Sequence, residues 1–237
     1  MTEAYRPKNA ASLILVRRDT GGAIEVLLTR RPPEMEFLGG VYVFPGGSVR
    51  KEDCSEALLE RCRGLTREEA QKNVGAHLSP KLCLGHWVAA IRELFEEVGV
   101  LLCVDESGKT VALEGRRERL MEKREALIEG SLKFHEFLES EKLLCDAARL
   151  AYFAHWLTPE EFPTRFDTRF YLACLPAGQS PLPASQEVSE SLWISPERAL
   201  KLSQGGVLPL IFPTYASLRM LADFDSSERL LAEYGLA

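Results

Sequence analysis

Short runs of apolar and β-branched residues mark the strands of this chain. Residues 11–17 and 24–29 are two such runs, and the polar turn at 19–22 between them predicts a β-hairpin. Two later runs, 151–157 and 169–175, predict a second strand pair. Shorter strands are predicted at residues 41–44, 100–104 and 191–194.

Helical spacing and capping residues mark a different set of segments. Thr66, with Glu69 three residues later, is a capping-box pattern that predicts a helix from residue 67. Ser195 before Pro196 predicts a helix that continues to about residue 203. The other predicted helices lie at 81–98, in two parts within 115–144, and in two parts within 208–237. Hairpins alternating with helices predict an α/β fold, a mixed sheet with helices packed on it.

The predicted helix at 81–98 carries three carboxylates on one stripe. At about 100° per residue, Glu96 lies near 300° and Glu97 near 40° when Glu93 is placed at zero. The apolar side chains fall between roughly 100° and 220°, on the opposite side. Like charges at this spacing repel, so the stripe indicates a hard divalent cation held by oxygen ligands. The alternative is an amphipathic helix with a solvated acidic face.

Composition narrows the class of protein. The chain has 237 residues, 46% of them hydrophobic and 27% charged, which is typical of a globular protein with a buried core. The net charge of −6 argues against a nucleic-acid partner. Six cysteines without a paired motif indicate reduced thiols and a cytoplasmic protein. We expect no membrane association, because no apolar run approaches about 18 residues.

Two separated stretches of the chain together resemble the Nudix box. In that family the box has a glycine, a glutamate six residues later and, after seven further residues, the run R-E-U-x-E-E-x-G-U, where U is apolar. The second half matches at every specified position, from Arg92 to Val100. Phe44-Pro45-Gly46-Gly47 resembles the first half. The resemblance implies an α/β/α sandwich with a mixed sheet.

The first half of the box departs from the family pattern. Counting from Gly47, the acidic position is Asp53, whereas counting from Gly46 gives Glu52, and we favour Asp53. Since 38 residues then separate Asp53 from Arg92 instead of seven, about 31 residues are inserted in the box. The expected organisation is a Nudix domain at 1–205 with a helical extension at 206–237 packed on it. Helical insertions are expected at about 54–80 and 115–147.

A box split in this way resembles the coenzyme A diphosphatase branch of the family. The stretch 27–31 followed by 40–47 also resembles the signature of enzymes that cleave coenzyme A, although Pro32 and Glu36 stand where that signature has Ser and Arg. The resemblance implies hydrolysis of coenzyme A or acyl-CoA to 3′-phosphoadenosine 5′-phosphate and (acyl-)4′-phosphopantetheine. The alternatives are an ADP-ribose or NADH pyrophosphatase and a non-catalytic Nudix ligand sensor.

The resemblance assigns catalytic roles to individual residues. Glu93, Glu96 and Glu97 are the expected ligands of Mg²⁺ or Mn²⁺. Arg92 is expected to orient a glutamate beside them through a charge-assisted pair. The general base is left open among three carboxylates: Glu93, Glu187 and Glu190.

Substrate contacts are expected from glycines and arginines. Gly46 and Gly47 would present backbone to the metal or to phosphate. Four arginines are candidates for gripping the phosphates, with structural ion pairs as the alternative for each: Arg30, Arg31, Arg165 and Arg169. The expected partner is a small nucleotide, and the resemblance also suggests a homodimer.

Overall fold

The first two apolar runs form the hairpin that they predict. A computed structural model gives the fold of residues 6–111, 113, 115–182 and 184–236. Strands β1 (Lys8–Arg18) and β2 (Ile24–Arg30) pair antiparallel. In β1, Leu13 and Leu15 face one side of the sheet and Ile14 and Val16 the other, as strand alternation requires. Because both faces are apolar, both must be covered.

The main sheet is mixed, which confirms the predicted fold class. Its strand order is β10-β2-β1-β9-β8, and β1 pairs parallel with β9 and antiparallel with β2. The later strands are β8 (Ala151–Leu157), β9 (Phe166–Cys174) and β10 (Glu190–Ile194). Two short strands, β3 (Tyr42–Val43) and β4 (Gly46–Ser48), pair with β2 and β1 respectively. They bring the first half of the box to the middle of the sheet.

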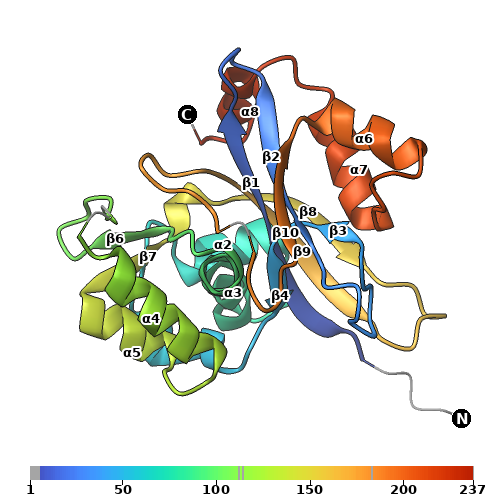
Figure 1. Cartoon of the computed structure of the whole chain (residues 1–237). Helices are drawn as coiled ribbons and strands as arrows, with labels where there is room; N and C mark the ends of the chain where they lie inside the picture. The colour runs from blue at the N-terminus through green and yellow to red at the C-terminus, as the bar shows by residue number, and fades with distance from the viewer. Residues whose placement is uncertain (1–5, 112, 114, 183, 237) are drawn as a thin grey trace, which may run out of the picture.

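Helices cover both faces of this sheet, so the molecule has three layers (Figure 1). One layer contains α3 (Pro80–Val98), α4 (Arg117–Ile128) and α5 (Phe134–Glu141). The other contains α6 (Pro196–Gln204), α7 (Phe212–Leu221) and α8 (Ser227–Glu233). We call the face toward α3 the α3 face and the face toward α6 and α7 the α6 face. The division at residue 205 stays a prediction, and α7 and α8 share the apolar core of the α6 face.

The inserted residues inside the box form compact structure beside α3. They follow η1 (Glu52–Cys54), which carries Asp53, and contain α1 (Glu56–Leu59), β5 (Cys62–Arg63) and α2 (Arg67–Val74). The predicted capping box at Thr66 is present, with Thr66 and Glu69 each bonding the other's backbone N–H. Strand β5 pairs with β7 (Leu143–Asp146), and β7 pairs with β6 (Cys103–Asp105). A 3₁₀ turn, η2 (Ala147–Arg149), leads from β7 to β8.

Three local predictions need correction. The strand expected at 100–104 begins only at Cys103. The helix expected to reach residue 144 ends at Glu141, because Lys142 adopts a left-handed conformation and the next four residues pair as β7. The strand expected at 41–44 is confined to Tyr42–Val43, and Gly46 and Gly47 lie in the separate strand β4. Of the described residues, no helix is both long enough and apolar enough to cross a membrane.

Candidate functional site

Helix α3 carries the acidic stripe, and its ends are fixed by local signals. The Ser79 hydroxyl accepts the Leu82 N–H, Pro80 occupies the first turn, and Gly99 ends the helix in a left-handed conformation. The three carboxylates of the stripe are buried, with 6%, 5% and 8% of the residue exposed for Glu93, Glu96 and Glu97. The alternative of a solvated acidic face is therefore wrong. Burying several carboxylates together requires compensating charge.

The paired glycines of β4 let the strand approach α3 closely. A Cβ on Gly47 would lie 2.6 Å from Oε1 of Glu93, so only glycine leaves room for that carboxylate. A Cβ on Gly46 would instead lie 2.4 Å from the Ala11 carbonyl oxygen in β1. The Gly46 N–H donates a long hydrogen bond to Glu97, with 3.4 Å between the Gly46 nitrogen and Oε2. The glycine pair thus places backbone against two of the three carboxylates.

Arg92 is the centre of a buried hydrogen-bond network. Its guanidinium donates two bonds of 2.8 Å to Asp53, one of 2.7 Å to Glu93 and one of 2.9 Å to Glu96. A fifth bond reaches the Ser48 carbonyl at 3.0 Å, so all five N–H donors of the guanidinium are used. Burial disfavours the charge of Arg92, but the bonds and charge of Asp53, Glu93 and Glu96 outweigh it and raise its pKa.

The same network decides between the two acidic positions of the split box. Asp53 is buried and bonds Arg92, and it also accepts the Arg50 N–H at 2.8 Å. Glu52 is exposed to solvent. The geometry therefore supports Asp53 as the residue that completes the first half of the box.

A second guanidinium, absent from the residues expected from the sequence, also contacts the stripe. Arg50 donates from its two terminal nitrogens to Glu96, at 3.1 Å to Oε1 and 2.8 Å to Oε2. It also lies 4.0 Å from Glu93 Oε1. Arg50 differs from Arg92 in exposure, because 47% of its side chain is accessible to solvent.

The carboxylates outnumber the cations that contact them. Four carboxylates (Asp53, Glu93, Glu96, Glu97) lie together and two guanidiniums (Arg50, Arg92) contact them, so the acidic groups outnumber the cations by two. Burial raises the pKa of Glu93, and the charge of Glu96 adds to this effect although Arg92 opposes it. Burial also raises the pKa of Glu97 well above its ordinary value, with further contributions from Glu93 and Glu187. This excess of acidic groups fits a bound divalent cation.

The carboxylates do not already form a complete metal-binding group. Across the described parts of the chain, no three acidic, histidine or cysteine side chains converge on one point in the manner of a metal site. The oxygens of Glu93 and Glu96 are instead bonded by Arg92 and Arg50. Oxygen ligation by these residues suits Mg²⁺ or Mn²⁺ in chemistry. A cation that coordinated Glu96 through Oε2 would displace one of the two guanidiniums from that oxygen.

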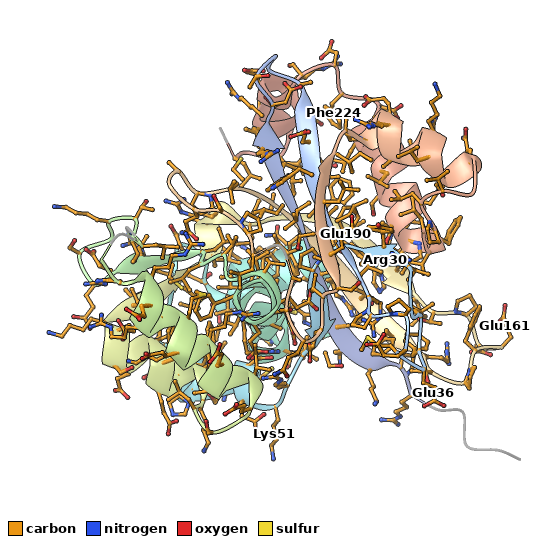
Figure 2. All side chains as sticks on the ribbon, viewed as in Figure 1. Arg30, Glu36, Lys51, Glu161, Glu190 and Phe224 are labelled. Carbon is orange, nitrogen blue, oxygen red and sulfur yellow. The ribbon has the colours of Figure 1, made fainter. Side chains whose placement is uncertain are left out.

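The two loop carboxylates predicted as candidate bases have different surroundings. The charge of Glu187 raises the pKa of Glu97, so Glu187 lies near the acidic stripe. Glu190 accepts a 2.8 Å bond from the Tyr42 hydroxyl, whose ring belongs to the core of the α6 face. Figure 2 shows Glu190 beside Arg30 on that side, and the two residues are paired across β10 and β2. The sheet therefore separates Glu190 from the carboxylates of α3.

The four candidate phosphate-binding arginines are also dispersed. Arg31 lies near the stripe, because its charge lowers the pKa of Glu97. Arg30 lies on the α6 face, 5.7 Å from the centre of the Tyr42 ring. Arg165 bonds the Thr158 carbonyl at 3.1 Å in the connection between β8 and β9. Arg169 is fully buried and pairs with Asp167 at 2.8 Å, so it presents no exposed atom to a ligand.

Arg124 is a further residue that the sequence did not indicate. It extends from α4 to the end of α3, where it donates to the Phe95 carbonyl at 3.0 Å and the Glu97 carbonyl at 3.2 Å. A cation at this position is favourable because the last carbonyls of a helix carry partial negative charge. Arg124 thus fixes the helix end on which the carboxylates lie.

Comparisons with known proteins agree with this geometry. A family model of the NUDT19 Nudix domain matches residues 7–220. The acyl-coenzyme A diphosphatase NUDT19 of Xenopus laevis is 26% identical over 231 residues, which cover 84% of this chain and 60% of the frog protein. Putative nudix hydrolase 7 of Caenorhabditis elegans is 28% identical over 232 residues, covering 97% of this chain and 65% of the worm protein.

A solved structure extends the similarity to the fold. A Nudix hydrolase from Alicyclobacillus acidocaldarius superposes with a TM-score of 0.73 at 26% identity, over 96% of each chain. The chain spans less than two thirds of the length of the frog and worm relatives. The family model nevertheless covers most of the present sequence, including both halves of the split box and α3. The chain therefore belongs to the Nudix hydrolase family, in the group described by the NUDT19 Nudix domain.

Proposed function

We propose that this chain is a divalent-metal-dependent diphosphatase acting on coenzyme A or acyl-CoA. The products would be 3′-phosphoadenosine 5′-phosphate and (acyl-)4′-phosphopantetheine. The observation that carries the proposal is the buried carboxylate group of α3, in a chain of the NUDT19 group, where the acidic side chains outnumber the guanidiniums that contact them by two. The naming of the frog relative as an acyl-coenzyme A diphosphatase supports the choice of substrate.

In this proposal the carboxylates hold the cation and Arg92 holds the carboxylates. Glu93, Glu96 and Glu97 supply the oxygens for Mg²⁺ or Mn²⁺. When bound, such a cation would offset the charge of the diphosphate and lower the pKa of an attacking water. Arg92 fixes the orientation of Glu93 and Glu96, because each accepts one N–H bond from its guanidinium. Asp53 in turn fixes the guanidinium by accepting a bond from Nε of Arg92.

Two residues near Glu97, Glu187 and Arg31, would act on the attacking water and on the substrate respectively. Glu187 is exposed and lies near Glu97, which makes it the better placed of the two loop carboxylates to accept a proton from water. Glu93 is the less suitable base, because it is buried and already bonded to Arg92. Arg31 is the candidate cation for a substrate phosphate, since its charge reaches Glu97 from the loop after β2.

Two other functions differ from this proposal in what the site would do. An ADP-ribose or NADH pyrophosphatase would use the same carboxylates on a substrate without the pantetheine arm. The substitutions at Pro32 and Glu36 and the position of Arg30 on the α6 face favour this alternative. A ligand sensor would bind nucleotide without hydrolysis. The homodimer and the cytoplasmic location stay proposals.

Product analysis separates these functions. The purified chain is incubated with Mg²⁺ or Mn²⁺ and with coenzyme A, acetyl-CoA, ADP-ribose or NADH, and the products are identified by mass spectrometry. The proposal expects 3′-phosphoadenosine 5′-phosphate from coenzyme A or its thioester, with the activity lost in Glu96→Gln and kept in Glu52→Gln, a matched change at an exposed position. Turnover of ADP-ribose or NADH without turnover of coenzyme A would contradict it.

A further inference from the structure

Arg50 and Arg92 hold the same carboxylate in different ways. Both donate to Glu96, but Arg92 has 2% of its side chain exposed and uses all five of its donors. Arg50 is about half exposed, and among the residues that the structure describes its side chain bonds only Glu96, with Glu93 at 4.0 Å. Arg92 is therefore fixed by burial and by its partners. Arg50 is the cation that can leave the carboxylate without exposing a buried charge of its own.

One oxygen of Glu96, Oε2, has no lone pair left for a further ligand. Oε2 accepts one bond from Arg92 at 2.9 Å and one from Arg50 at 2.8 Å, which uses both of its lone pairs. Oε1 accepts a bond from Arg50 at 3.1 Å. A cation that coordinates Oε2 must displace one of the two guanidiniums. Arg92 donates one bond to Glu96, but it is held in place by four other bonds in a buried network. Arg50 is held to Glu96 by a solvent-accessible pair, so it is the easier of the two to displace.

We propose that Arg50 is a displaceable counter-ion of Glu96, which competes with the divalent cation for that carboxylate and then binds the substrate diphosphate. This inference rests on the proposed function for the identity of the ligand. When the cation takes Glu96, the Arg50 guanidinium stays close to the carboxylates because its backbone is fixed beside them, and about half of its side chain is already exposed to solvent. A guanidinium can bond two phosphate oxygens at once, as it does the two oxygens of Glu96. Arg50 is then a positioning residue for the diphosphate.

Direct metal titration tests the competition without any turnover. Mn²⁺ is added to the full chain, and free Mn²⁺ is measured by electron paramagnetic resonance for the wild type, Arg50→Ala, Arg50→Lys and Lys51→Ala. Arg50→Ala is expected to tighten Mn²⁺ binding about fivefold, the factor that corresponds to about 1 kcal/mol from an exposed ion pair. Arg50→Lys should tighten binding less, because an ammonium still pairs with Glu96 but cannot bond both oxygens in the same fork geometry.

Lys51 provides the matched control. It is the next residue and carries the same charge, and Figure 2 shows its side chain extending away from the rest of the molecule. Its loss removes one positive charge from the neighbourhood but no bond to Glu96. Lys51→Ala is therefore expected to change Mn²⁺ affinity by less than about twofold, because a solvent-exposed charge is screened by salt.

The second half of the proposal needs a phosphate ligand. Methylenediphosphonate, which cannot be hydrolysed as pyrophosphate is, is titrated into the Mn²⁺-loaded protein by calorimetry, and Arg50→Ala should weaken its binding about tenfold while Lys51→Ala does not. Unchanged or weaker Mn²⁺ binding in Arg50→Ala, or unchanged diphosphonate affinity, overturns the proposal. Failure to hydrolyse coenzyme A would count against the proposed function. It would not change the Mn²⁺ and diphosphonate affinities, which test the role of Arg50 independently.

Discussion

Asp53 and Arg92, 39 positions apart in the sequence, face each other through two hydrogen bonds of 2.8 Å. Both side chains are almost fully buried, and the two bonds run side by side from the guanidinium to the two carboxylate oxygens. This pair joins the two halves of the split box. Although the inserted residues separate them in sequence, α3 and the glycine-containing strand β4 therefore lie next to each other in the fold.

Removing Asp53 should destabilise the fold far more than removing its neighbour. In Asp53→Ala, Arg92 stays buried with two donors unpaired, so the free energy of unfolding is expected to fall by about 3–5 kcal/mol. Glu52→Ala, at an exposed position, should stay within about 0.5 kcal/mol of the wild type. Urea denaturation measures both values. Equal effects of the two substitutions would show that Glu52 shares the role given to Asp53.

Features set by neighbouring residues were predictable from the sequence. The caps at Thr66 and Ser195 depend on contacts within a few residues, and each lies where its pattern predicts. The side of α3 on which the carboxylates lie follows from helical spacing alone. Their burial does not follow, because it depends on β4 and η1 packing against that side.

Contacts between distant segments were not predictable. Arg50 and Arg124 approach the acidic helix from elements that lie 46 and 27 positions away in the sequence, and neither position carries a local signal. The face on which Glu190 lies is a partial exception. Because side chains alternate along a strand, Glu190 lies on the same face as Leu192 and Ile194, which the sequence alone predicts. That this is the α6 face is known only from the packing of those two residues in the structure.

The two glycines of β4 should respond differently to an added methyl group. In Gly47→Ala the new Cβ meets a carboxylate, that of Glu93, so we expect Mn²⁺ affinity and activity to fall by about 10–100-fold with a smaller change in stability. In Gly46→Ala the Cβ meets backbone atoms of β1, which cannot move without disrupting the sheet, so stability should fall by about 2 kcal/mol or more. Thermal melts and Mn²⁺ titration separate the effects. A larger loss of stability in Gly47→Ala than in Gly46→Ala would contradict the assignment.

His86 should make the fold sensitive to acid. Burial, together with the charge of Arg169, lowers its pKa from 6.5 to about 4, although a bond to the Leu82 carbonyl opposes the shift. Because the unfolded chain binds this proton more tightly, stability falls as the pH falls from 6.5 toward 4. By about pH 5, protonation linked to His86 is expected to have lowered the free energy of unfolding by about 2 kcal/mol.

Replacing His86 with an apolar residue of similar size isolates that contribution. His86→Leu cannot take up the proton, so its unfolding free energy should fall by about 2 kcal/mol less than that of the wild type between about pH 8 and about pH 5. Urea denaturation at the two pH values gives the difference. An identical loss in both proteins would mean that other groups account for the acid sensitivity.

Gln179 anchors the segment that leads to Glu187. Its side-chain amide accepts the Leu101 N–H at 2.8 Å and donates to the Leu101 carbonyl at 2.9 Å, just beyond the end of α3. Nearby, the Leu182 N–H bonds the Val98 carbonyl at 2.8 Å. These bonds attach the segment to the same helix that carries Glu97. We therefore expect Gln179 to influence the position of Glu187 relative to Glu97.

A double-mutant cycle tests whether Gln179 acts through Glu187. Glu187→Gln should lower kcat by about 10²–10⁴-fold with a small change in KM, as expected for loss of a general base. Gln179→Ala alone should lower kcat by a smaller factor. Added to Glu187→Gln, it should cause no further loss, because the general base that Gln179 would position has already been removed. Steady-state kinetics with coenzyme A measure all four proteins. Multiplicative losses in the double variant would show that Gln179 supports the site by a route independent of Glu187.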